Sequence, residues 1–107
     1  MKYFGLWEEH SDVGDGFRYA EDDLPTDDEI LFAWYWDEDY SGSAYVLFRK
    51  DGKLWEVYGS HCSCYGLEDQ WDPEETTEEY LKSRLRDGYF YPTGDAMEVL
   101  RKLIESL

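Results

Sequence analysis

Hydrophobic and polar positions in the first half of the chain predict short strands separated by polar segments. Lys2–Trp7 alternates weakly, which indicates a first strand, whereas His10–Pro25 is rich in Gly, Asp and Ser and is expected to be a long loop. Large and aromatic side chains fill Glu29–Trp36 (EILFAWYW), as in a strand that is buried on at least one face. Asp37–Gly42 is expected to be a turn region.

The strongest local signal is a hairpin that follows this strand. Ser43–Lys50 (SAYVLFRK) and Lys53–Tyr58 (KLWEVY) both have the composition of strands. Asp51-Gly52 stands between them, and this dipeptide favours a tight two-residue turn. Together with Glu29–Trp36, the hairpin predicts an antiparallel meander.

The C-terminal part predicts two helices after an aperiodic segment, Gly59–Glu75. Thr76 and Glu79 have the spacing of a capping box, which predicts a helix from there to about Asp87. Gly88 follows and is expected to end that helix in a left-handed conformation.

A last helix is expected after Thr93, which would cap it, with Asp95 in the first turn where the helix dipole favours an anion. Its apolar residues form one face, which is expected to cover the sheet: Met97, Leu100, Leu103, Ile104 and Leu107. The predicted fold class is therefore α+β, a single domain over residues 1–107 in which a small antiparallel sheet packs with two C-terminal helices.

Composition places the acidity of the chain on a folded body. Of 107 residues, 42% are hydrophobic and 19% aromatic, which is too apolar for a disordered acidic tail. The 26 acids and 10 bases leave a net charge of −16, whereas solubility of a small domain needs a magnitude of only about 2–8. This charge argues against direct binding of nucleic acid or of an anionic membrane, and it leaves a basic protein, a cationic ligand or a metal ion as partners.

The first residues of the chain and its two cysteines indicate in which cellular compartment the protein is expected. Met1–Leu6 is a short apolar stretch followed by Glu8 and Glu9, so no signal peptide is expected, and no apolar run approaches the length of a membrane span. Cys62 and Cys64 are too close in sequence for an unstrained disulfide, which favours free thiols in a reducing environment. We expect a cytoplasmic protein.

Acidic residues concentrate in positions 1–42, where 13 acids and two bases give a net charge of −11. Carboxylates two residues apart on an extended chain share a face at a spacing of about 6.7 Å, which resembles the charge repeat of a nucleic-acid strand. The alternative is that each cluster is simply a solvated face. The predicted binding residues are the acids Asp22, Asp23, Asp27, Asp28, Glu29, Asp37, Glu38 and Asp39, with Trp36 and Tyr40 as aromatic anchors.

Aromatic residues are dense in and around the predicted meander. Alternation along Glu29–Trp36 must turn either Phe32, Trp34 and Trp36 or Leu31, Ala33 and Tyr35 outward. One face would then expose an aromatic ladder suited to an interface, unless both faces are covered and these side chains fill the core.

The segment His61-Cys62-Ser63-Cys64 supplies three side chains that could bind a metal, with His10 as a possible fourth ligand. It could also supply a thiol nucleophile with His10 as base, although nearby carboxylates would raise the pKa of either thiol. The simpler alternative is a tight loop with small buried thiols. We therefore assign no metal, cofactor or catalytic residue and expect no enzyme. Gln70–Thr77 is expected to be structural, with Trp71 packed across the start of the next helix.

The stretch from Asp28 to Leu81, with the core GSHCSCYGLEDQWDPEETT, resembles a family of small uncharacterised proteins of phages and prophages. The resemblance implies a small phage-type accessory protein. Many such proteins inhibit bacterial defence, including restriction and CRISPR systems, and several are acidic mimics of nucleic acid. We therefore expect this chain to bind and inhibit a host nuclease or defence complex through a basic surface of that partner, as a monomer or a homodimer. The alternatives are a metal- or thiol-dependent protein that uses the His61–Cys64 loop and a generic interaction module whose acidity only keeps it soluble.

Overall fold

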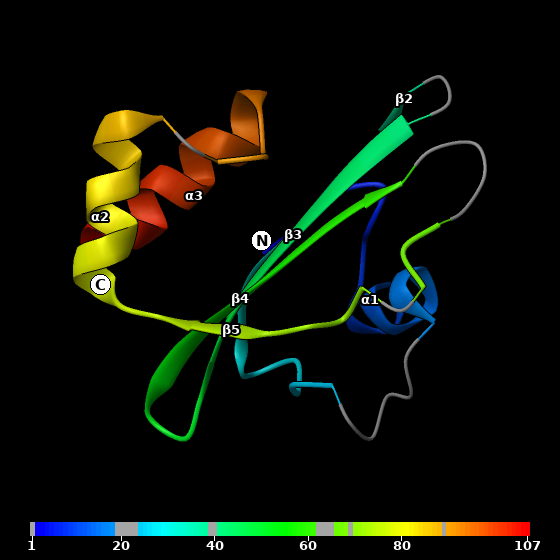
Figure 1. Cartoon of the computed structure of the whole chain (residues 1–107), viewed down its shortest axis with the longest axis horizontal. Coiled ribbons are helices and arrows are strands. Elements are labelled where there is room, and N and C mark those ends of the chain that lie inside the picture. Colours follow the sequence, from blue (N-terminus) through cyan, green and yellow to red (C-terminus); the bar gives the residue numbers. More distant parts are fainter. Residues whose placement is uncertain (1, 19–23, 39–40, 62–65, 69, 89) are drawn as a thin grey trace.

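A computed structural model describes residues 2–18, 24–38, 41–61, 66–68, 70–88 and 90–107, with the side chain of Glu38 left out. Five strands form one sheet in chain order, and helices cover both of its faces (Figure 1). The elements are β1 Tyr3–Gly5, α1 His10–Phe17, β2 Ile30–Glu38, β3 Ser41–Lys50, β4 Lys53–His61, β5 Glu74–Thr76, α2 Glu78–Asp87 and α3 Gly94–Ser106. The strands β2 to β5 are antiparallel neighbours and β1 is parallel to β2, so the predicted α+β fold is confirmed.

The predicted meander is present and longer than its sequence pattern indicated. Asp51 and Gly52 both have positive φ angles, 55° and 77°, as a two-residue turn between β3 and β4 requires. β2 continues to Glu38 and β3 begins at Ser41, so most of the predicted turn region is strand. Cross-strand pairing extends these strands beyond their most hydrophobic residues.

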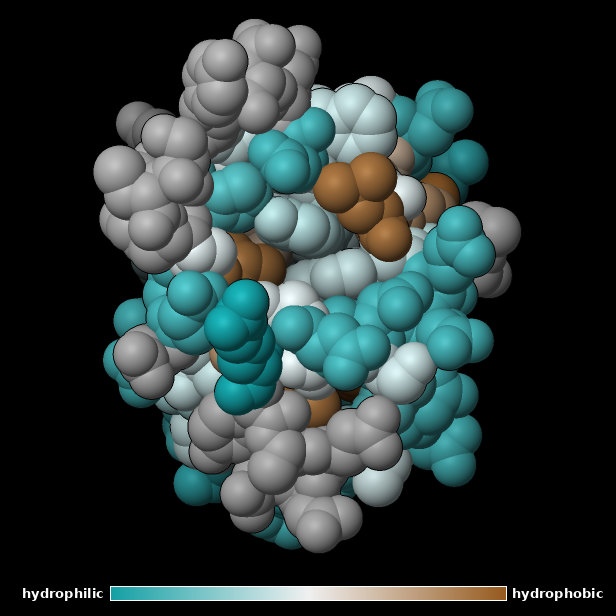
Figure 2. Space-filling model, turned by 90° about the vertical axis from the view of Figure 1, so that its right-hand side faces the viewer, coloured by the Kyte–Doolittle hydropathy of each residue, from teal (hydrophilic) through white to brown (hydrophobic). Residues whose placement is uncertain are grey.

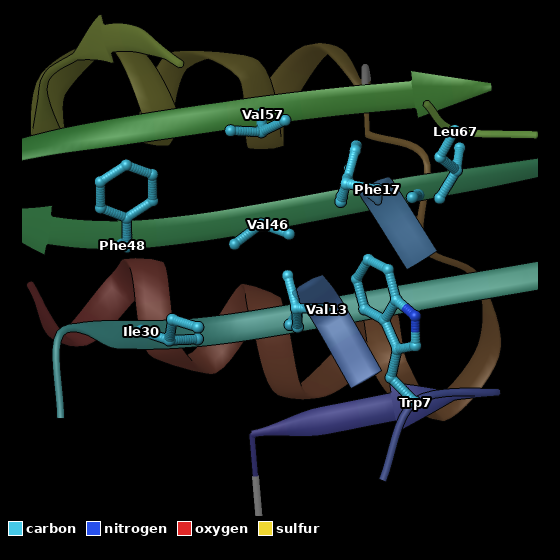
Figure 3. Packing of buried hydrophobic residues seen from close by; sticks show 10 residues of the cluster. Trp7, Val13, Phe17, Ile30, Val46, Phe48, Val57 and Leu67 are labelled. Atoms are coloured by element: carbon cyan, nitrogen blue, oxygen red, sulfur yellow. The ribbon is translucent and has the colours of Figure 1, made fainter. Parts of the chain in front are cut away.

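The expected loop at His10–Pro25 is wrong in its first half, where α1 forms. The Asp12 carboxylate accepts hydrogen bonds from the backbone N–H groups of Glu8 and Glu9, 2.7 Å and 3.0 Å away, which stabilises the start of this helix. Val13 and Phe17, four residues apart, point into a cluster with Trp7 on one face of the sheet (Figure 3). Burial of this face outweighs the low helix propensity of the glycines in α1.

The helices α2 and α3 cover the opposite face of the sheet. Leu81 of α2 and Leu100 and Ile104 of α3 are buried against Phe32 and Tyr45 of the sheet. This packing confirms that the apolar side of the last helix lies on the sheet.

The end of α2 and the start of α3 lie where they were predicted, whereas the residue that caps the start of α2 differs. Gly88 ends α2 with φ 80°, and Thr93 occupies the residue before α3, although its side chain makes no capping hydrogen bond. The cap of α2 is Thr77, whose hydroxyl accepts a hydrogen bond from the Tyr80 N–H at 3.1 Å. Thr76 is the last residue of β5, so the predicted capping residue is wrong by one position.

Because both faces of the sheet are covered, β2 presents no exposed aromatic ladder. Phe32 and Trp34 are buried under α2 and α3, and Tyr35 is half-buried on the α1 side. Trp36 is 47% exposed.

The expected position of Trp71 across the start of α2 is wrong. Its ring packs against the cluster that contains α1, on the sheet face opposite α2.

Gln70 covers part of the free edge of β4. Its side-chain amide accepts from the Ser60 N–H at 2.8 Å and donates to the Ser60 carbonyl at 2.6 Å and to the Gly66 carbonyl at 2.9 Å. The amide thus takes the place that a neighbouring strand would occupy.

Replacement of Gln70 by alanine is expected to lower the free energy of unfolding by about 1–2 kcal/mol, because three hydrogen bonds are lost near the surface. Hydrogen exchange of the Ser60 amide, followed by NMR, should accelerate. Asp72→Ala, a change at an exposed neighbour, is the control. Equal exchange rates in the two variants would contradict this function of Gln70.

Candidate functional site

The predicted acidic residues lie at the two ends of β2. Asp27, Asp28 and Glu29 immediately precede the strand, and Asp37 is close to its end. A separation of nine residues in an extended strand corresponds to roughly 30 Å. Asp22, Asp23, Asp39 and Tyr40 lie outside the described residues, and for Glu38 only the backbone is described. Among the described acids, Asp27, Asp28 and Glu29 therefore lie at one end of this strand and Asp37 at the other.

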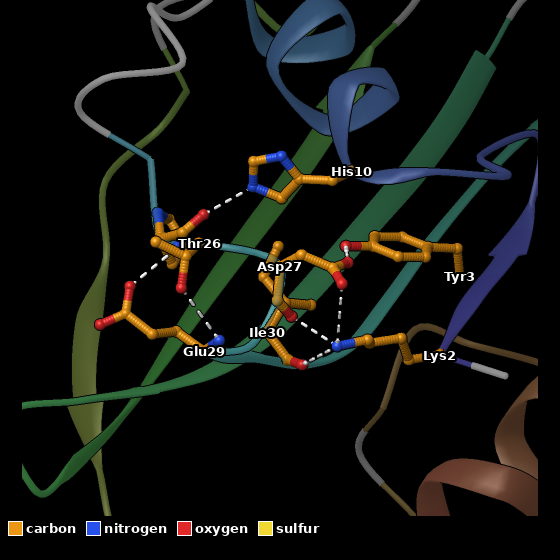
Figure 4. Close-up of polar contacts among 8 residues, drawn as sticks. Lys2, Tyr3, His10, Thr26, Asp27, Glu29 and Ile30 are labelled. Carbon is orange, nitrogen blue, oxygen red and sulfur yellow. Dashed lines mark hydrogen bonds and ion pairs between the residues drawn. The ribbon is translucent and has the colours of Figure 1, made fainter.

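Among the predicted acids that the structure describes, Asp27 is bound by both Lys2 and Tyr3 (Figure 4). The Tyr3 hydroxyl donates to the Asp27 Oδ1 at 2.5 Å, and the Lys2 Nζ lies 3.8 Å from the Asp27 Oδ2. Lys2 also donates to the backbone carbonyls of Asp27 and Ile30. The hydrogen bond from Tyr3 is the largest cause that lowers the pKa of Asp27, so this carboxylate stays ionised.

The turn before β2 is joined to the start of α1. The Nε2 atom of His10 is 2.7 Å from the Pro25 carbonyl (Figure 4). Thr26 and Glu29 close the turn: the Glu29 carboxylate accepts from the Thr26 N–H at 2.8 Å, and the Thr26 hydroxyl accepts from the Glu29 N–H at 3.3 Å. Glu29 therefore has a structural role in this turn, whereas Asp28 is exposed.

At the other end of β2, Asp37 lies on the α1 side of the sheet with Tyr35 and His61. The His61 Nε2 is 2.6 Å from the Tyr35 hydroxyl and 3.6 Å from the Asp37 Oδ1. Burial is the largest cause that raises the pKa of Tyr35, so its phenol stays protonated. Because side chains alternate along a strand, Trp36 points to the face opposite Asp37. The predicted aromatic anchor is exposed, but it lies on the α2–α3 side.

Sequence reasoning did not assign three acids near α1 to the site: Glu8, Glu9 and Asp15, all of them exposed. With Asp27, Asp28 and Asp37 they form what we call the α1-side acidic surface. On the side of the molecule where α1 lies, hydrophilic residues surround a few hydrophobic ones among the described residues (Figure 2). These three acids were visible in the charge count, but the expected loop offered no basis for placing them.

Charge is divided between the two helical layers. The described residues of α1 and of the segments that flank it, 2–18 and 24–29, carry seven acids and two bases, Lys2 and Arg18. The helices α2 and α3 carry six acids and five bases, which leaves them a net charge of only −1. Because α1 and the pair α2–α3 cover opposite faces of the sheet (Figure 1), the negative field is strongest on the α1 side.

The metal and thiol alternatives can be placed only in part. His10 and His61 have different neighbours, the Pro25 carbonyl and the Tyr35 hydroxyl. Cys62 and Cys64 lie outside the described residues. Within the part of the chain that the structure describes, no three His, Cys, Asp or Glu side chains are arranged to hold a metal ion. Metal or thiol chemistry at this loop therefore stays an alternative to the predicted binding function.

No protein-family model, curated protein or solved structure matches the chain. The resemblance to phage proteins is therefore still a prediction. Among the described helices, none has the length and apolar composition that crossing a membrane requires.

Proposed function

We propose that this chain is a phage-type binding protein whose α1-side acidic surface docks on the basic nucleic-acid site of a host nuclease or defence complex and blocks it in the host cytoplasm. The observation that carries this proposal is the lack of compensation on that surface. Of its six carboxylates, only Asp27 has a lysine or arginine partner among the described residues.

Uncompensated carboxylates on a rigid body repel one another, and a cationic surface relieves this repulsion. The same field attracts a basic partner over a distance that shortens as salt is added, since the Debye length is about 8 Å at physiological ionic strength. A partner that normally binds nucleic acid offers clustered lysine and arginine side chains. The proposal assigns no catalytic residue and no cofactor to this chain.

The double variant Asp15→Asn/Asp28→Asn is expected to bind the partner at least fivefold more weakly, because two carboxylates of the surface lose their charge. The partner is first captured from host lysate and identified, and its affinity is then measured by titration calorimetry at two salt concentrations. Duplex DNA should displace the wild-type chain from the partner.

The matched control is Asp87→Asn/Glu105→Gln, which removes two exposed charges on the α2–α3 side. The proposal fails if both double variants lose affinity equally, since net charge rather than the α1-side surface would then govern binding. It also fails if DNA and the wild-type chain bind the partner together.

A further inference from the structure

The outer edge of β1 is open to another strand. The Ala33 N–H donates to the Lys2 carbonyl and the Leu6 N–H donates to the Tyr35 carbonyl, both at 2.8 Å. In a parallel pair, alternate residues bond to the neighbour, so Lys2, Phe4 and Leu6 face β2. The backbone N–H and C=O groups of Tyr3 and Gly5 therefore point away from the sheet, and β1 is its outermost strand (Figure 3).

The opposite side of the sheet is better protected. The edge of β4 is covered by β5 and by the Gln70 amide. The outer strand β5 carries Glu75, which pairs with Lys53 at 3.3 Å, and the helix that follows carries Glu78, which pairs with Arg49 at 3.6 Å. Such charged pairs discourage strand addition. No comparable cover over β1 is found within the described ranges.

A groove runs beside β1 and combines apolar walls with carboxylates. It is lined by Lys2, Tyr3, Phe4, Gly5, Trp7, Glu8 and Asp27. Leu6, next to the groove, is 52% exposed. The ammonium group of Lys2 is already bound to Asp27 and to the Ile30 carbonyl, so Glu8 is the charge that remains for a guest.

An extended peptide suits this groove in both its backbone and its side chains. Its N–H and C=O groups can pair with those of Tyr3 and Gly5, and its side chains alternate between the two faces of the sheet. On the α1 face, a guest lysine or arginine would reach Glu8, next to the Asp27 carboxylate that Lys2 and Tyr3 already bind. Apolar guest residues would contact the aromatic walls.

We infer that β1 accepts an extended lysine- or arginine-containing segment of a protein partner as a sixth strand, beside the carboxylates of Glu8 and Asp27. This inference rests on the proposed function, because it specifies how a basic partner is held. It adds directional backbone hydrogen bonds to an attraction that charge alone would leave unspecific.

The test uses the full chain and two synthetic octapeptides of alternating lysine and valine. One has ordinary peptide bonds, and the other is N-methylated at every backbone nitrogen. The two share charge and side chains, but only the first has backbone N–H donors. Binding is followed by NMR at the amides of Tyr3 and Gly5. We expect the ordinary peptide to shift both amides and to bind at least tenfold more tightly than the methylated one.

Charge recognition is tested with Glu8→Gln, which should weaken the ordinary peptide about two- to fivefold. Glu105→Gln on α3 removes the same charge from the opposite layer and should leave the affinity unchanged. Equal losses in the two variants would overturn the assignment of Glu8.

Three results would overturn strand addition. The first is equal binding of the two peptides, which would leave the proposed acidic docking intact and show that β1 takes no part in it. The second is that neither peptide binds at concentrations up to about 1 mM. The third is a shift of the Tyr3 and Gly5 amides with protein concentration alone, which would identify a second copy of this chain as the occupant. Conversely, the peptide could add to β1 as a strand while the capture experiment recovers no basic partner. That pair of results would refute the docking proposal but not strand addition.

Discussion

Replacement of Arg84 by methionine is expected to lower the free energy of unfolding by about 3–5 kcal/mol, because it leaves a buried carboxylate without its counter-ion. The Arg84 Nη1 donates to both carboxylate oxygens of Glu56, at 2.6 Å and 2.7 Å. Glu56 is 4% exposed and Arg84 8%. Tyr45 and Tyr58 also donate their hydroxyls to Glu56. Urea unfolding monitored by tryptophan fluorescence measures the change.

The matched control for this prediction is Arg86→Met, two residues later on the exposed side of α2. It removes the same charge and should change stability by no more than about 0.5 kcal/mol. The double variant Glu56→Gln/Arg84→Met removes both charges and should recover part of the loss. Equal stability of the two single variants would show that the Glu56–Arg84 pair does not hold α2 to the sheet.

Gly5→Ala is expected to destabilise the protein by about 3 kcal/mol or more, the second largest effect. Gly5 has φ 72°, a conformation that costs about 1–2 kcal/mol for a residue with a side chain. In addition, a Cβ atom at Gly5 would lie 2.0 Å from the Tyr35 carbonyl oxygen. The backbone of β1 would have to move away from β2, and its pairing with Ala33 and Tyr35 would weaken. Thermal unfolding followed by circular dichroism tests this.

Gly52→Ala separates the two causes of this loss. Gly52 has a similar φ of 77°, but a Cβ atom there would meet nothing within 4 Å. It should therefore show only the conformational cost of about 1–2 kcal/mol. If the Gly5 and Gly52 variants lose the same stability, β1 does not pack on β2 as closely as the structure shows.

The largest predicted losses of stability and the proposed binding surface involve different parts of the molecule. The Glu56–Arg84 pair lies between the sheet and α2, where Arg84 is also surrounded by aromatic rings, with its guanidinium carbon 4.3 Å from the centre of the Phe90 ring. The proposed contacts with a partner lie on the α1 side and along β1. Asp15, Asp28 and Glu8 can therefore be changed without disturbing this buried pair, which makes the binding experiments interpretable.

Local chemistry explains why much of the fold was predictable. The Asp51-Gly52 turn, the glycine that ends α2 and the apolar face of α3 depend on neighbours in sequence, so each leaves a pattern that can be recognised without the structure. The helix α1 leaves a poor pattern. Gly14 and Gly16 disfavour it, and its stability comes from Val13 and Phe17 packing on strands far away in sequence.

The candidate site shows the same division. The excess of carboxylates in the first part of the chain was evident, and so was a preference for a cationic partner. Which carboxylates lie together was not evident, because a nine-residue strand separates Asp28 from Asp37 while the His10–Pro25 contact brings α1 beside the turn that holds Asp27. The open edge of β1 was equally hidden, since it depends on which strand pairs with β2.

By itself, the sequence determined the α+β class, the central hairpin, both C-terminal helices and the sign of the surface charge, since these follow from composition and from contacts between near neighbours. Only the tertiary structure decided that α1 forms, that both faces of the sheet are buried and that Glu8 and Asp27 line one groove beside a free strand edge. These features arise from contacts between residues distant in sequence, and the free energy of such contacts depends on the assembled sheet rather than on any local pattern.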